Sequence, residues 1–180
     1  MDLVESLELL EHSGGSIIMR AFAIIFSVLI VIGMRPVNGE DDAASKLLGV
    51  WKLTSLKLRI VGDASLETDV FGSNPKGYLI FTKEGRMATV LSAADRKPPA
   101  KDADYIALMK SFSAYTGKYT VEDGRWITKV DVSWNEVFSS QDQLRFFKLE
   151  GDLLSVQTRE QSDVLPGEKV VFTLTFARER

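Results

Sequence analysis

The chain has 180 residues and 45% hydrophobic content, enough for one domain with a buried core. Its 22 basic and 25 acidic residues give a formal net charge of −3, so the basic excess typical of nucleic-acid-binding proteins is missing. Because the chain has no cysteine, disulfides, thiolate nucleophiles and cysteine-linked lipids are excluded.

The first predicted element is an uncharged apolar segment at residues 21–34, preceded by Arg20. Its 14 residues fall short of the roughly 20 that a membrane-spanning helix needs, but they match the apolar region of a secretory signal. Val37 and Gly39 fit the two positions that signal peptidase reads. The sequence therefore predicts cleavage near Gly39 and a secreted or periplasmic product. The alternative is an uncleaved segment that anchors the protein to a membrane.

Residues 1–18 carry four acidic side chains, whereas a signal needs a basic start. This favours translation from Met19. We therefore divide the chain into an N-terminal extension with a signal helix, residues 1–39, and one domain, residues 40–180. Without the first part the chain keeps 20 basic and 21 acidic residues, and it loses its one histidine, His12.

The domain reads as a series of short strands separated by turn residues. Hairpin turns are predicted at Glu84-Gly85, Asp123-Gly124 and Gly151. A long loop is expected at residues 62–76, and a helix at 102–115, capped by Asp102. The eight predicted strands are residues 50–61, 77–83, 86–92, 118–122, 125–134, 143–149, 153–159 and 169–178. Eight antiparallel strands in chain order predict an all-β, up-and-down barrel with one short helix, and a two-sheet sandwich is the alternative.

Gly49-x-Trp51, at the start of the first strand, resembles the lipocalin signature. In lipocalins this tryptophan plugs the closed end of the barrel, and an arginine late in the last strand lies across it. The last predicted strand places Arg178 on one face with Phe172 and Phe176. The resemblance therefore implies a cation–π contact between Arg178 and Trp51. The alternative is that Arg178 lies at a frayed strand end.

Other parts of the chain resemble the bacterial and fungal lipocalin-like domain family more specifically. The matching pieces lie at residues 48–55, 71–82, 85–87, 114–119, 130–133, 143–145 and 149–154. Together they cover nearly all of residues 47–178. Most members of this family have no known activity, so the resemblance implies an architecture and little chemistry. Lipocalins often carry disulfides and this chain has no cysteine, so a transport role is not simply carried over.

The common catalytic arrangements lack their residues in this domain. Nucleophilic triads and catalytic zinc sites need the histidine or cysteine that residues 40–180 do not contain. No phosphate-binding loop, dinucleotide motif or calcium loop is present, and we predict neither a cofactor nor a metal. Two charged strand residues stay candidates. Asp131 is a solvated partner of Lys129 if it faces outward, and a proton-transfer group with a raised pKa if it faces inward. Arg145 would bind a carboxylate or an enolate if it faces inward.

Aromatic and long side chains spread over several strands are typical of a lined cavity. The predicted ligand-binding residues are Tyr78, Met87, Tyr119, Trp126, Trp134, Arg145, Phe147 and Phe172. The alternative is a barrel filled by its own side chains.

Three hypotheses follow. The first is an exported barrel that binds a small hydrophobic or amphipathic molecule. The second is a histidine-free isomerase or cyclase that uses Asp131, Arg145 and tyrosines on a polyketide- or terpenoid-like substrate, which rests on resemblance. The third is a filled barrel that serves as a structural or interaction domain. In none of them is nucleic acid a partner, and a membrane is contacted only through an uncleaved signal segment.

Overall fold

The computed structural model describes residues 39–180, with side chains at 42–63 and 66–180. The predictions for the signal segment and for Met19 lie outside these residues. The helices are α1 (Gly39–Leu47), α2 (Asp102–Lys110) and α3 (Glu136–Ser139). The strands are β1 (Gly49–Ile60), β2 (Asp63–Asp69), β3 (Lys76–Phe81), β4 (Arg86–Ser92), β5 (Phe112–Glu122), β6 (Arg125–Ser133), β7 (Gln143–Glu150), β8 (Leu153–Thr158), β9 (Gln161–Leu165) and β10 (Glu168–Arg178). Within this part of the chain, no helix combines the length and the apolar character needed to cross a membrane.

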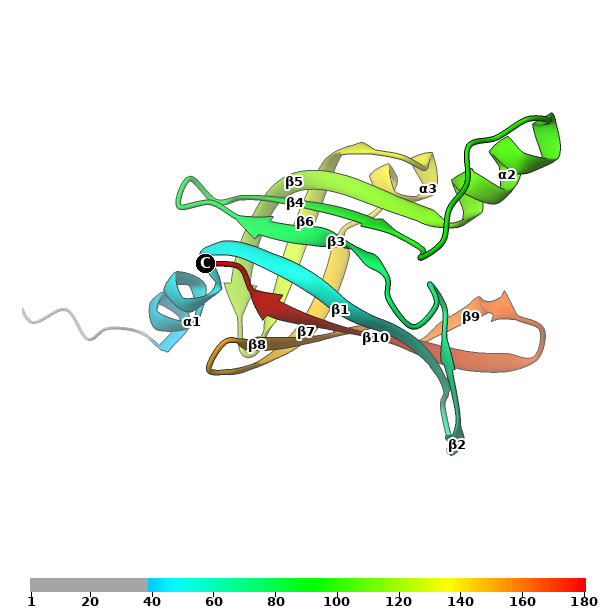
Figure 1. Cartoon of the computed structure of the whole chain (residues 1–180). Helices are drawn as coiled ribbons and strands as arrows, with labels where there is room; N and C mark the ends of the chain where they lie inside the picture. The colour runs from blue at the N-terminus through cyan, green and yellow to red at the C-terminus, as the bar shows by residue number, and fades with distance from the viewer. Residues whose placement is uncertain (1–38) are drawn as a thin grey trace, which may run out of the picture. The chain divides into compact units, whose positions relative to one another are not determined.

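Eight antiparallel strands close into a barrel (Figure 1). The order is β1-β3-β4-β5-β6-β7-β8-β10, and β10 returns to pair with β1 from Trp51↔Arg178 to Ile60↔Val170. This closure confirms the predicted barrel and rules out the two-sheet sandwich. Successive strands are joined by hairpins such as the turn at Gly85, where a φ of 76° suits glycine.

Two additional strands, β2 and β9, correct the predicted count. The segment predicted as a long loop at 62–76 contains β2, which pairs with the second half of β1. Similarly, β9 pairs with the start of β10. Strands β1 and β10 are long, with 12 and 11 residues, and their far ends need hydrogen-bond partners outside the barrel. The two added strands supply these partners as hairpin extensions.

The predicted helix at 102–115 is too long. Helix α2 ends at Lys110, and Phe112 and Tyr115 belong to β5 instead, paired with Ser92 and Thr89 of β4. The spacing of three between Phe112 and Tyr115 suits one face of a helix, whereas in β5 it puts them on opposite faces. Pairing with β4 therefore outweighs the local pattern. Helix α2 buries none of its residues. The structure also has α1 and α3, where one helix was predicted.

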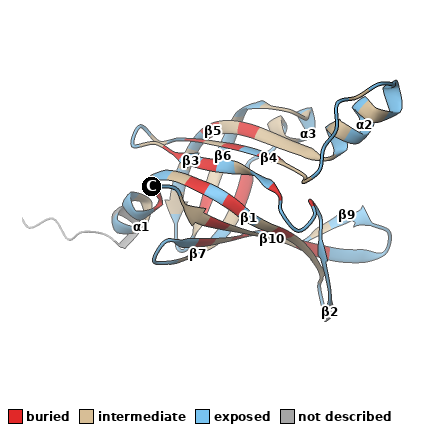
Figure 2. Ribbon diagram, viewed as in Figure 1, coloured by how far each residue is buried: buried red, intermediate tan, exposed pale blue. Residues whose placement is uncertain are grey.

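Inward-facing side chains alternate with outward-facing ones along each barrel strand. The buried positions recur as separate bands along β1 and its neighbours (Figure 2). The core runs through the barrel and comprises chiefly Trp51, Leu53, Leu56, Leu79, Phe81, Met87, Trp126, Leu154, Val156 and Phe176. Bulges between Leu53 and Ser55, and between Thr116 and Gly117, shift the alternation within β1 and between β5 and β6.

Candidate functional site

One end of the barrel is sealed by Trp51. Its side chain is fully buried, and the indole Nε1 donates a hydrogen bond to the carbonyl oxygen of Leu47 at 2.8 Å. The guanidinium carbon of Arg178 lies 4.0 Å from the centroid of the indole ring. This is the cation–π contact that the lipocalin signature implied, so Arg178 is not at a frayed end.

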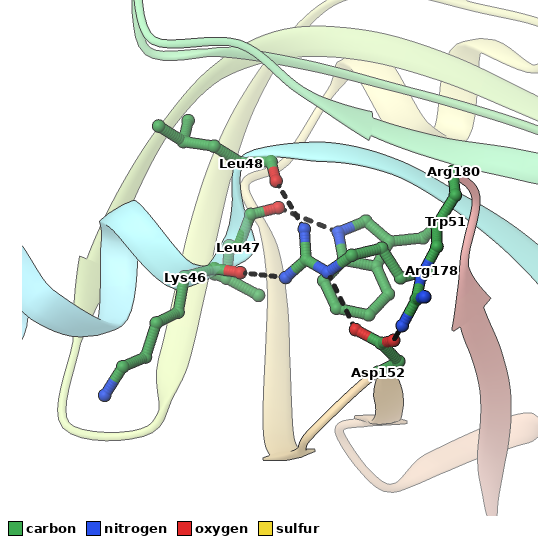
Figure 3. A network of polar contacts seen from close by, with 7 residues as sticks. All are labelled: Lys46, Leu47, Leu48, Trp51, Asp152, Arg178 and Arg180. Atoms are coloured by element: carbon green, nitrogen blue, oxygen red, sulfur yellow. Dashed lines mark hydrogen bonds and ion pairs between the residues drawn. The ribbon is translucent and has the colours of Figure 1, made fainter.

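Arg178 also binds the end of helix α1 (Figure 3). Its Nη1 donates to the carbonyl of Leu48 at 2.8 Å and its Nη2 to that of Lys46 at 2.6 Å. Carbonyls at a helix C-terminus lack intrahelical partners and carry partial negative charge, so a cation is favoured there. Gly49, with φ 117°, leaves room for this arrangement, since a Cβ would lie 3.3 Å from Nη1 of Arg178.

Asp152 completes the closed end from the turn between β7 and β8. Its carboxylate lies 3.5 Å from Nε of Arg178 and accepts a hydrogen bond of 2.5 Å from Arg180. The hydrogen bond from Arg180 lowers the pKa of the Asp152 carboxyl, and the charges of Arg180 and Arg178 act in the same direction. The closed end is thus held by one buried ring and a short chain of charged contacts.

We expect Arg178→Ala to lower the free energy of unfolding by about 1–3 kcal/mol, because it removes a stacked cation and two hydrogen bonds to helix carbonyls. Denaturant titration measures this loss. Arg180→Ala is the matched control. It removes only an exposed ion pair to Asp152, so its loss should be clearly smaller. Equal losses for the two variants would contradict the sealing role of Arg178.

The inner wall away from the sealed end is polar on one side. Arg145 on β7 is cross-strand to Trp126 of β6 and to Thr158 of β8, and Gln143 is cross-strand to Thr128. Paired residues in a ladder point to the same face, and Trp126 and Thr128 are buried inside the barrel. The structure therefore places Arg145 inward, which settles the question that its sequence left open.

The Arg145 side chain is partly buried and held in place by its neighbours. Nη1 donates to the carbonyl of Leu144 at 2.8 Å, and Nη2 donates to Oε1 of Gln143 at 3.1 Å. The guanidinium carbon lies 5.9 Å from the ring centroid of Tyr115 on β5. Among the described side chains, no carboxylate lies within ion-pair distance of Arg145. Its positive charge is therefore not neutralised inside the described barrel.

Two further polar groups on this side lack partners. Trp126 Nε1 and Thr128 Oγ1 are buried and make no hydrogen bond with any described residue. Both belong to β6, directly beside β7 with Gln143 and Arg145. Unpaired buried polar groups are uncommon, so their grouping beside an unneutralised cation marks this part of the wall as a polar site.

The part of the inner wall beside this polar site is apolar. It consists of Leu56, Leu58, Phe147, Val156, Phe172 and Leu174. Phe147, Phe172 and Leu174 are only partly buried although they face inward. These inward-facing residues are therefore partly accessible to solvent, as Arg145 is.

An aromatic cluster lies where β6 leads into α3. Tyr115 stacks on Phe138 of α3, with ring centroids 5.6 Å apart and planes at 26°. Trp134 lies just after β6. The centroid of its ring is 6.4 Å from that of Phe138 and 6.3 Å from that of Phe112. The ring over which Arg145 lies is thus itself fixed by α3. Trp134, one of the predicted ligand-binding residues, packs within this cluster.

Of the other predicted ligand-binding residues, Tyr78 faces outward. It is 42% exposed and lies opposite Val90 on the outer face. Leu79 and Phe81 take the inward positions of β3, so alternation forces Tyr78 out. The prediction that Tyr78 lines the interior is therefore wrong.

Met87, Tyr119 and Trp126 face inward but are packed within the core. Met87 is fully buried. The Tyr119 ring lies 4.9 Å from that of Phe81, and its hydroxyl donates to the Thr82 carbonyl at 3.4 Å. Burial raises the pKa of Tyr119, so its phenol stays protonated. These residues support the wall, whereas Arg145, Phe147 and Phe172 are both inward and reached by solvent.

Asp131 faces outward and forms an ion pair with Arg86, with Oδ2 and Nη1 2.6 Å apart. Its side chain is 43% exposed. The outward position matches the solvated alternative, although the partner is Arg86 and not the predicted Lys129. Asp131 and Arg145 therefore lie on opposite faces of the wall, and the acid–base pair of the enzyme hypothesis is not formed.

Sequence reasoning missed the polar residues that accompany Arg145. Thr128 and Thr158 were not singled out, and Tyr115 was assigned to a helix. The sequence does contain a signal for this polar site, because polar residues recur at alternate positions of neighbouring strands. That pattern can be interpreted only when the inward face of each strand is known. Within the described residues, no group of three His, Cys, Asp or Glu side chains is placed to hold a metal ion.

Comparison with known proteins agrees with this architecture. No curated protein matches the chain in sequence. A family model described as a lipocalin-like domain matches residues 48–179, which include every strand of the closed barrel, Trp51 and Arg178. The chain therefore belongs to the lipocalin-like domain family.

Proposed function

We propose that this barrel binds one small amphipathic molecule against its inner wall. The observation that carries the proposal is the division of that wall into two sides. The apolar part of the molecule lies along Phe147, Phe172 and Leu174, and its polar end lies near Arg145 and Gln143. Small-molecule sites have this composition, with mostly apolar walls and a few polar groups that fix orientation.

The two rival hypotheses have less support. A filled structural barrel does not account for partly exposed inward side chains such as Phe172. An isomerase or cyclase needs an acid or base near its substrate. The inward positions of the described ladders that close the barrel carry no carboxylate, since Glu168 of β10 pairs with β9 beyond them. Binding of a small molecule needs only the inner wall and no acid or base.

Export is part of the same proposal. The apolar segment at residues 21–34, followed by Val37 and Gly39, supports a cleaved secretory signal on sequence grounds. A ligand-binding domain without cysteine or histidine has no need of disulfide formation or metal loading after export. The product would begin near Glu40 and act outside the cytoplasm.

Native mass spectrometry of the protein purified gently from an exporting host tests both parts. We expect a chain mass that begins near Glu40 and a reproducible additional mass of about one drug-sized molecule, since sites of this kind hold one such ligand. Organic extraction then identifies its class. A chain without added mass, also after incubation with dodecanoic acid and 1-dodecanol, would contradict ligand binding. A product that retains residues 21–34 would contradict cleavage.

A further inference from the structure

We infer that the molecule bound in the barrel carries a carboxylate, and that Arg145 is the residue that binds it. This inference rests on the proposed function and adds the chemical class of the ligand. Its basis is the distribution of charged residues on the inner wall. Among the inward positions of the ladders that close the described barrel, which end on β10 at Val170, the charged residues are Arg145 and Arg178, because Glu168 pairs with β9 beyond that point. Arg178 is committed to the sealed end, where it meets Trp51 and Asp152.

Arg145 is therefore a lone cation on a wall that contains no described carboxylate. A charge in such surroundings is stabilised by a partner of opposite sign, because low-dielectric surroundings strengthen the attraction and water supplies less solvation. The hydrogen-bond acceptors that it has are neutral, the Leu144 carbonyl and the Gln143 amide. Both orient the guanidinium and neither balances its charge.

The guanidinium keeps donors for a ligand. Arginine has five N–H donors, and two of them are used by Leu144 and Gln143, which leaves three. A carboxylate accepts two parallel bonds from one arginine, and such charge-assisted pairs are stronger than neutral hydrogen bonds. Gln143 is buried and Tyr115 supports the guanidinium, so the side chain is already ordered before a ligand arrives.

The size of the charge selects a carboxylate over other head groups. One guanidinium balances one negative charge, as a carboxylate provides. A phosphate monoester carries about −1.5 to −2 at neutral pH and would leave part of its charge uncompensated. An alcohol gains only a hydrogen bond without charge, and an amine is repelled by Arg145.

The surroundings of Arg145 also determine where the rest of the ligand lies. Phe147 is two residues further along β7 on the same face, about 7 Å away at the rise of an extended strand. From Phe147 the apolar side continues around the barrel wall through Val156 of β8 and Leu174 of β10. A carboxylate bonded to Arg145 therefore has an apolar surface within reach of its first few carbon atoms.

Isothermal titration of the delipidated protein with three C12 molecules tests this inference. We expect dodecanoic acid to bind about ten- to a hundredfold more tightly than 1-dodecanol, the range that charged hydrogen bonds provide. Dodecyl phosphate should bind more weakly than the acid. Equal affinities for acid and alcohol would overturn the inference and leave the proposed function standing. Tighter binding of the phosphate would overturn the carboxylate assignment. Binding of none of the three would contradict the proposed function itself.

Variants assign the effect to Arg145. Arg145→Gln should remove the difference between acid and alcohol while the affinity for 1-dodecanol stays within about twofold, because the apolar wall is unchanged. Arg145→Lys keeps the charge but loses the two-pronged geometry, so it should restore part of the preference. Arg59→Gln is the matched control, since Arg59 lies on the outer face of β1 between inward Leu58 and Ile60. A preference that survives in Arg145→Gln would overturn the assignment. If that variant does not fold, the wild-type comparison of acid, alcohol and phosphate still decides.

Discussion

Replacing Trp51 with alanine should lower the free energy of unfolding by about 3–5 kcal/mol, the range for removal of a fully buried aromatic side chain. Trp51 and Trp126 are the two largest fully buried side chains of the described core. Loss of the Trp51 side chain leaves a cavity at the sealed end, deprives the Leu47 carbonyl of its indole donor and removes the ring beneath Arg178. All three effects lower the free energy of unfolding.

Denaturant titration followed by far-ultraviolet circular dichroism measures this change. Trp134→Ala serves as the control, because Trp134 is only partly buried beyond the end of β6 and should cost clearly less. Trp51→Phe should recover part of the loss by refilling most of the volume. A near-neutral result for Trp51→Ala would show that the sealed end is not held by this side chain.

Gly117→Ala should cost about 3 kcal/mol, at the upper end of the range for overpacking. A Cβ at this position would lie 2.1 Å from the backbone oxygen of Lys129 and 2.8 Å from its carbonyl carbon. Because these are backbone atoms, no side chain can rotate away, and β5 and β6 must separate at their bulge. The expected result is a less stable barrel with its ladder disturbed beside Thr128.

Gly151→Ala is the matched control for this prediction. Gly151 has φ 61° in the turn between β7 and β8, and a Cβ there would meet nothing within 4 Å. Only backbone strain of about 1–2 kcal/mol is expected. The two variants can be compared by thermal and denaturant unfolding. If Gly117→Ala costs no more than Gly151→Ala, the close approach of β5 and β6 is not what requires glycine at residue 117.

Several features of this protein were readable in the sequence alone. Turn residues between short alternating segments predicted eight antiparallel strands, because hairpin geometry depends on local residues such as Gly85 and Gly124. The contact of Trp51 with Arg178 followed from a short signature and a position late in the last strand. The residue types that the domain lacks were also evident from the sequence. Without histidine or cysteine, residues 40–180 cannot form catalytic arrangements that require those side chains, whatever the fold.

Other features could not be read from local patterns. Strands β2 and β9 exist because β1 and β10 extend past the barrel and need partners, which is a property of the closed sheet. The end of α2 at Lys110 depends on the pairing of the next residues with β4. In both cases contacts between distant segments outweighed local preference.

The orientation of the candidate site was the feature that only the tertiary structure decided. Alternation shows which residues of a strand share a face, but not which face is the inner one. Tyr78 and Leu79 are both apolar enough for either side, and pairing with β1 and β4 places Leu79 inside. Bulges such as that at Gly117 shift the alternation again, so Asp131 lies outside and Arg145 inside only because of their neighbours across the strands. The sequence by itself determined the barrel and its residue types, and strand register determined which of those residues meet in the interior.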